Sequence, residues 1–195
     1  MKKLLVAALL LVGTTSIAQT FQLGLKGGVN VSNFNGGDFH NIDKKALVGF
    51  HAGGFVNFQF GDHFSLQPEV LFSSQGAKLK ESTDEQNIRL SYINVPVMLK
   101  YRFTGGFYLE AGPQIGFKVD ESIGDEEVED FAKSTDLSIA GGLGFHSSSG
   151  LGIGARYTAG ISKVGDFNSN SIDPDFKNGV IQVSLFYTLF NNNKK

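Results

Sequence analysis

The feature that most constrains this chain is a series of eight segments in which apolar and polar residues alternate. In the clearest one, residues 48–60, the even positions are apolar or small and the odd positions are mostly small or polar. A period of two predicts β-strands with two unlike faces. The predicted strands are residues 21–32, 46–60, 64–75, 88–103, 107–119, 136–146, 151–161 and 179–190.

The connections between these segments are alternately long and short. The short ones, residues 61–63, 104–106 and 147–150, contain glycine, which is typical of tight turns. This asymmetry predicts an all-β fold, an eight-stranded antiparallel up-and-down transmembrane β-barrel. We expect the short turns and both chain ends to lie in the periplasm and the long loops outside. Eight strands leave a lumen that side chains just fill, which argues against an open solute channel.

The N-terminal residues have the pattern of an export signal. Lys2 and Lys3 precede an apolar run over residues 4–12, and small residues follow it. About nine apolar residues are too few for a transmembrane helix. We therefore predict a signal peptide over residues 1–18, followed by one outer-membrane barrel domain over residues 19–195.

Composition excludes several classes of protein. No cysteine occurs, so there is no lipid-modified cysteine, disulfide or thiolate metal site. Without the two lysines of the predicted signal, 15 basic side chains stand against 19 acidic ones. This balance does not indicate nucleic acid binding. Glycine, with 25 residues, and phenylalanine, with 18, fit a glycine-lined interior and an aromatic exterior.

The two faces of the predicted strands differ in a way that favours lipid outside. The apolar faces carry no charge, and the opposite faces are mainly Gly, Ser, Asn and Gln. A soluble periplasmic barrel that binds a small apolar ligand, the rival interpretation, would instead have its apolar face inward and a charged exterior. Aromatic residues also gather beside the short turns, as in a periplasmic girdle: Phe58, Phe60, Phe64, Tyr101, Phe103, Phe107, Phe145 and Tyr187.

Six charged residues lie at strand positions that are predicted to point into the barrel. They form a predicted lumen charge cluster: Lys26, Glu69, Lys100, Arg102, Glu110 and Arg156. If Phe103 pairs with Phe107, Lys100 lies opposite Glu110 and forms an ion pair with it. Arg156 would face Ala140 or Gly142. Buried charges need partners, so a structural network is favoured over a gated polar path or a proton relay.

The sequence gives little support for catalysis. The four histidines, His40, His51, His63 and His146, are scattered and lack zinc-site or triad spacing. His51 and His146 point inward and are expected to form hydrogen bonds. We predict no catalytic, cofactor-binding or metal-binding residues. A lipid A-modifying enzyme remains an alternative.

The long connections contain an acidic run and several aromatic residues. The run comprises Asp120, Glu121, Asp125, Glu126, Glu127, Glu129 and Asp130. It does not match a calcium loop, so a solvated surface is favoured over a divalent-cation site that bridges to lipopolysaccharide. Phe34, Phe39, Phe167 and Phe176 are interpreted as loop-packing anchors, with partner contact as the alternative.

Pro68, Pro96 and Pro113 fall inside predicted strands, where each removes a ladder hydrogen bond. A closed barrel has no free edge on which to place them. We therefore expect β-bulges or local widening at these positions.

Several motifs in order carry a family resemblance: residues 24–32 (GLKGGVNVS), 66–77 (LQPEVLFSSQGA), 92–101 (YINVPVMLKY), 107–116 (FYLEAGPQIG) and 152–157 (GIGARY). Together they closely resemble the PorT-like outer-membrane β-barrel family of Bacteroidetes. The resemblance implies an eight-stranded barrel in the outer membrane of a Gram-negative bacterium. The family's namesake is associated with type IX secretion, a role that the resemblance does not transfer.

The expected function is that of an integral outer-membrane barrel with a filled lumen, in a structural or interaction role. Expected partners are outer-membrane lipid, lipopolysaccharide and a protein bound through the extracellular loops. The outer-membrane assembly machinery is a further expected partner, and it would recognise residues 183–190. A monomer is expected. The first alternative to this function is the soluble periplasmic barrel that binds a small apolar ligand. A secretion-pathway component, a lipid A-modifying enzyme and a narrow channel are less favoured.

Overall fold

The computed structural model describes residues 20–36, 43–81, 84–123, 126–127, 132–164 and 176–192. The predicted signal peptide lies outside these residues. The strands are β1 (Thr20–Gly36), β2 (Asp43–Phe60), β3 (Phe64–Glu81), β4 (Asp84–Arg102), β5 (Phe107–Ile123), β6 (Glu126–Glu127), β7 (Thr135–His146), β8 (Leu151–Gly160) and β9 (Phe176–Asn191).

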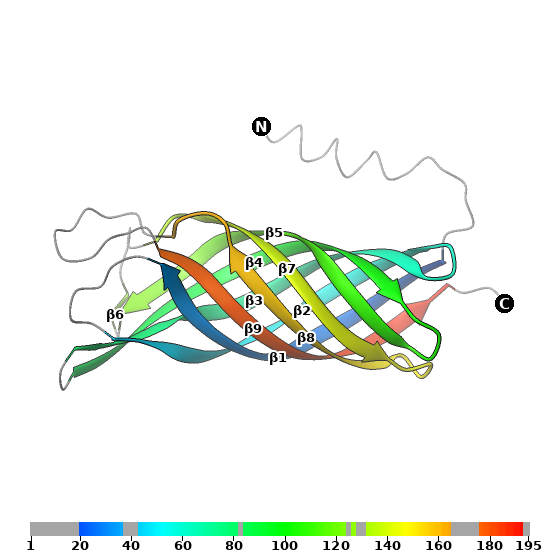
Figure 1. Ribbon diagram of the computed structural model, residues 1–195, viewed down its shortest axis with the longest axis horizontal. Helices are drawn as coiled ribbons and strands as arrows, with labels where there is room; N and C mark the ends of the chain where they lie inside the picture. The colour runs from blue at the N-terminus through cyan, green and yellow to red at the C-terminus, as the bar shows by residue number, and fades with distance from the viewer. Residues whose placement is uncertain are drawn as a thin grey trace.

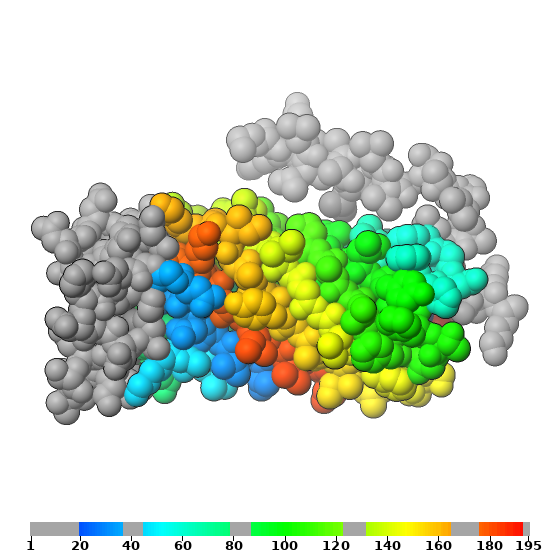
Figure 2. Space-filling view, viewed as in Figure 1, coloured from blue at the N-terminus to red at the C-terminus, as the bar shows by residue number. Residues whose placement is uncertain are grey.

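Eight long strands form one closed antiparallel barrel (Figure 1). The strand order is β4-β3-β2-β1-β9-β8-β7-β5, and the pairing of β4 with β5 closes the ring. Figure 2 shows the strands winding obliquely around the wall. The predicted fold is confirmed, with one addition: the two-residue β6 pairs with the end of β5. In the described residues, no helix is long and apolar enough to cross a membrane.

The three short turns lie together at one end of the barrel, where β1 begins and β9 ends (Figure 1). Glycines with positive φ allow these turns: Gly61 (71°), Gly105 and Gly106 (both 97°), and Gly150 (89°). We call this end the short-turn end. In outer-membrane barrels of this architecture it faces the periplasm.

The outward face of the wall is apolar. Leu25, Val70, Ile139 and Leu185 are each 55–60% exposed, and the same parity is apolar along every long strand. The inward face holds buried Asn, Gln, Ser and charged side chains. This is the reverse of a soluble barrel with an apolar interior. The face predicted to meet lipid is therefore the outward face of the barrel.

Outward aromatic rings form a continuous belt at the short-turn end. Ring centroids lie 6.3 Å apart for Phe60 and Phe64, 5.0 Å for Phe64 and Tyr101, and 4.8 Å for Tyr101 and Phe103. Phe103 continues to Phe107 at 5.7 Å. The predicted girdle is therefore present in this part of the wall.

The prolines interrupt the ladders without shifting them. The β3–β4 pairing goes from Pro68↔Val97 to Leu71↔Asn94, which skips two pairs and keeps the register. Of the two expected features, β-bulges are absent at this position, because a missing N–H removes a bond without requiring an extra residue. The skipped pairs are a local gap in the ladder, in line with local widening. Register shifts occur elsewhere: at Leu23/Gly24, Ala46/His51 and Ser91/Tyr92.

Two apolar clusters lie inside the barrel. Phe55, Tyr108 and Phe186 form a small aromatic cluster towards the short-turn end. A larger cluster at the opposite end includes Phe34 and Phe176, whose ring centroids are 4.5 Å apart. These two residues therefore pack as anchors, as expected, and Phe39 and Phe167 lie outside the described residues. Polar and charged side chains fill the space between the clusters.

Candidate functional site in the barrel lumen

Glu69 of β3 is the centre of a buried ion-pair network. Its Oε1 accepts from Lys26 Nζ of β1 at 2.6 Å. Arg156 of β8 donates through Nη2 to Oε1 at 2.8 Å and through Nη1 to Oε2 at 3.0 Å. Glu69 is 1% exposed. One carboxylate therefore holds two cations that come from different walls of the barrel.

Glu110 of β5 is the second carboxylate of this network. Arg156 donates to its Oε1 through Nε at 2.8 Å and Nη2 at 2.7 Å. Lys100 Nζ lies 3.4 Å from Glu110 Oε2, and the two residues are directly opposite in the β4–β5 register, as the sequence predicts. Arg156 faces Gly142, which is one of the two expected positions and has no side chain to hinder the guanidinium.

Lys100 also contacts two residues, Gln67 and Tyr108, that are not among the predicted site residues. Its Nζ lies 3.8 Å from the centroid of the Tyr108 ring and donates to Gln67 Oε1 at 3.2 Å. Such a position over an aromatic face stabilises a cation. Gln67 and Tyr108 each lie two residues before a predicted carboxylate, Glu69 or Glu110, on the same strand face. The strand period could have identified both.

Arg102 does not join the ion-pair network, which corrects its place in the predicted charge cluster. Its Nη2 donates to the backbone carbonyl of His146 at 2.7 Å, and its side chain is only partly buried. It lies one inward position beyond Lys100, at the end of β4, where the strand leaves the packed lumen. The other five predicted residues come together.

A neutral hydrogen-bond network lies next to the charges. His51 bonds Asn30 Oδ1 through Nδ1 at 2.7 Å and Ser184 Oγ through Nε2 at 2.8 Å. His146 Nε2 lies 3.1 Å from Thr188 Oγ1. Both inward histidines are thus hydrogen-bonded, as expected. Among the described residues, no three His, Asp or Glu side chains converge as metal ligands would.

The acidic run is only partly described. Asp120 is exposed, whereas Glu121 is buried, pairs with Lys118 at 2.8 Å and accepts from the Ala132 backbone N–H at 3.0 Å. The positions of the remaining side chains of the run are not among those described. Cation binding by this run stays a prediction.

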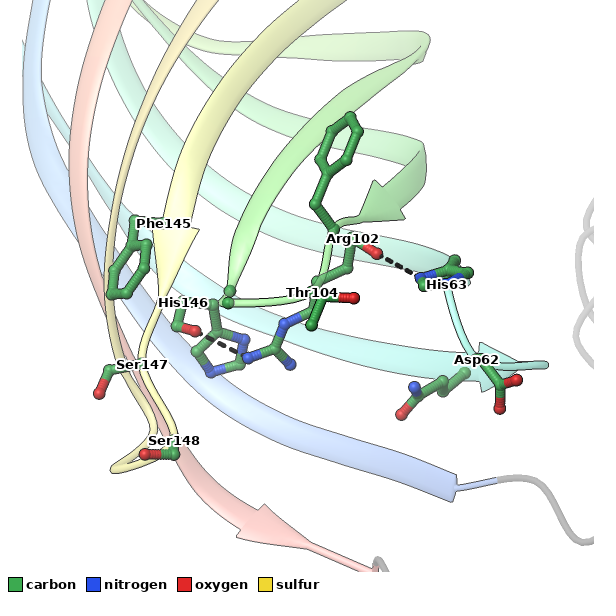
Figure 3. A pocket seen from close by; sticks show the side chains of 12 residues that line it. Asp62, His63, Arg102, Thr104, Phe145, His146, Ser147 and Ser148 are labelled. Atoms are coloured by element: carbon green, nitrogen blue, oxygen red, sulfur yellow. Dashed lines mark hydrogen bonds between the residues drawn. The ribbon is translucent and has the colours of Figure 1, made fainter.

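A recess opens at the short-turn end. Its two lobes have volumes of about 540 and 550 Å³. Their linings share Gln59, Arg102, His146, Ser147 and Ser148. Figure 3 shows Arg102 reaching across the recess towards His146, with His63 bonded to the Arg102 carbonyl. Below the recess, beside Lys100 and Tyr108, the free volume falls to about 20 Å³. That volume is about one water molecule.

Comparisons with known proteins agree with this geometry. The family model "outer membrane protein beta-barrel domain" matches residues 17–166. Among solved structures, Neisserial surface protein A (NspA) is similar with a TM-score of 0.56 and 13% identity, over 86% of this chain and 97% of that one. No curated protein sequence matches.

A second similar structure is that of Ail, the attachment invasion locus protein of Yersinia pestis, in complex with the heparin analogue sucrose octasulfate. Its TM-score is 0.50 and its identity 17%, over 89% of this chain and 100% of that one. At these identities the likeness concerns the fold, an outer-membrane barrel of the same size.

Proposed function

The chain belongs to the outer membrane protein beta-barrel domain family, and from this premise we propose that it acts through its outer surfaces and not through its lumen. It is an integral outer-membrane β-barrel. The proposed role is structural or interaction-based, with the long connections as the contact surface for a partner.

One observation carries this proposal: an ion-pair network crosses the lumen. Lys26, Glu69, Lys100, Glu110 and Arg156 are each 7% exposed or less, and they tie β1, β3, β4, β5 and β8 together. Moving a solute along the axis would break buried ion pairs, each of which costs about 3–5 kcal/mol to break. A free volume near 20 Å³ beneath the recess supports the same conclusion.

Conductance in planar lipid bilayers tests the sealed lumen. The refolded wild-type protein should give no unitary current steps. A Glu69→Gly/Arg156→Gly double variant, which removes both sides of the central contact, should give small steps if it folds. Regular steps from the wild-type protein would contradict the proposal and favour the narrow channel.

Epitope insertion tests which surface is offered to a partner. A tag placed within residues 165–175 should react with antibody on intact cells, because the end of β8 and the start of β9, which flank these residues, lie opposite the short turns. The matched control is the same tag within residues 147–150, which should react only after the outer membrane is permeabilised. The reverse labelling would contradict the orientation.

The finer assignments belong to the same proposal. Membrane fractionation and heat-modifiable migration in detergent gels should show the protein in the outer membrane. Its N-terminus should be Gln19 after removal of the signal peptide.

We further propose that the protein is a member of the PorT-like subgroup of Bacteroidetes. We do not extend the secretion role of that family's namesake to it, and we propose that it has no enzymatic activity. Lipid A from cells with and without the gene should then have identical mass spectra.

A further inference from the structure

The recess at the short-turn end contains a cation whose charge no described carboxylate neutralises. Arg102 donates through Nη2 to the His146 carbonyl, a neutral acceptor. Of its five N–H donors, the others have no protein acceptor among the described residues. An arginine fork in such a position matches the two oxygens of a carboxylate or a phosphate.

The network behind Arg102 adds to this positive charge. Three cations, Lys26, Lys100 and Arg156, share two carboxylates, Glu69 and Glu110, which leaves an excess of one positive charge. Lys100 is the cation of this set nearest the recess, and it lines the small cavity beneath it together with Arg102. A low-dielectric wall focuses this field into the opening.

The remaining lining of the recess suits an anion. Gln59, Ser147 and Ser148 offer neutral hydrogen-bond donors. Asp62 is the one acid among the residues that line the recess. It is exposed at the rim, and Figure 3 shows it beside His63, away from the Arg102 guanidinium.

We propose that this recess is a binding site for a small oxyanion, a carboxylate or phosphate group presented from the periplasm and held by the Arg102 guanidinium. The volume of about 540 Å³ admits a small metabolite or the end of a peptide, and the sealed lumen behind it prevents passage. The site rests on the recess and its charges, and it is independent of whether the long connections bind a partner.

The chain offers a direct experiment because its sequence contains three arginines, Arg89, Arg102 and Arg156. The mature protein, labelled with ¹⁵N-arginine, is refolded in a maltoside detergent, which carries no phosphate. Inorganic phosphate and acetate are titrated separately, with chloride at matched ionic strength. The Arg102 Nε–H signal should shift saturably with phosphate, acetate or both, and which anion acts tells a phosphate site from a carboxylate site.

Arg89 is the internal control, because it is exposed at the opposite end of β4, and Arg156 is buried in the network. For the variants the protein is labelled with ¹⁵N-serine instead, and binding is followed through the Ser147 and Ser148 amides. Arg102→Gln should weaken binding by about tenfold or more, the loss of one charge-assisted contact. Arg89→Gln should leave it unchanged. If Arg102→Gln does not fold, Arg102→Lys should fold and bind several-fold more weakly.

Three results would overturn the site: no saturable shift of the Arg102 signal with either oxyanion, an equal shift of the Arg89 signal, or an equal response to chloride.

Discussion

Arg156 and Glu69 lie 87 residues apart in the sequence, yet the Arg156 guanidinium donates two hydrogen bonds, of 2.8 and 3.0 Å, to the Glu69 carboxylate. Their strands, β8 and β3, are four places apart in a ring of eight, so the contact joins opposite walls. Because each residue also holds a second partner, the contact connects all five charges into one network.

Glu69→Gln should destabilise the barrel by about 3–5 kcal/mol, since it leaves Lys26 and Arg156 buried with one carboxylate fewer. The measurement is urea unfolding of protein refolded into lipid vesicles. Asp62→Asn, a similar loss of charge at an exposed position, is the control and should change the free energy of unfolding by less than about 0.5 kcal/mol. Equal effects of the two substitutions would show that the network does not stabilise the barrel.

Lys100→Ala should destabilise by about 1–3 kcal/mol, which is less than Glu69→Gln. Glu110 loses a contact of 3.4 Å but keeps Arg156 at 2.7 Å. The exposed Lys45→Ala on β2 is the matched control. An unfolding midpoint for Lys100→Ala that coincides with that of Lys45→Ala would disprove the pairing.

Much of the fold could be predicted because the short turns fix the register. At the short-turn end every predicted strand boundary lies within one residue of the observed one, since turn glycines mark it. At the other end most strands are longer than predicted: β3 reaches Glu81 and not residue 75, and β4 begins at Asp84 and not residue 88. Paired strands that extend beyond the membrane need no apolar face, so residues 76–87 do not show the alternation.

The site was predictable only where it depends on neighbouring strands. Lys100 and Glu110 face each other across one hairpin, so turn length alone places them. Glu69 meets Lys26 two strands away and Arg156 four strands away. Those contacts depend on barrel closure and on the reach of long side chains, which strand parity does not specify. Arg102 has the same parity as the others, but its position at the strand end places it in the recess.

Gly28→Ala should destabilise the barrel by about 1–3 kcal/mol, the usual cost of overpacking. A Cβ at Gly28 would lie 1.9 Å from the Val183 carbonyl oxygen of the adjacent strand, so the backbone would have to move. Its neighbour Gly27 is the control, because a Cβ there comes no closer than 3.5 Å to another strand. Unfolding in the same vesicle assay should separate the two variants. Equal stability would show that β1 and β9 can move apart without cost.

Val183→Lys tests the face that meets lipid. Val183 lies at the middle of β9, points outward with 44% exposure, and pairs with Val29, which is also exposed. A lysine at the bilayer midplane costs about 2–4 kcal/mol, and one near the interface about 0–1 kcal/mol. Ile161→Lys, just beyond the end of β8 and 59% exposed, is the control for an interfacial position. On a water-facing wall both substitutions would be nearly neutral, so only a depth-dependent loss in the free energy of unfolding agrees with a lipid-facing wall.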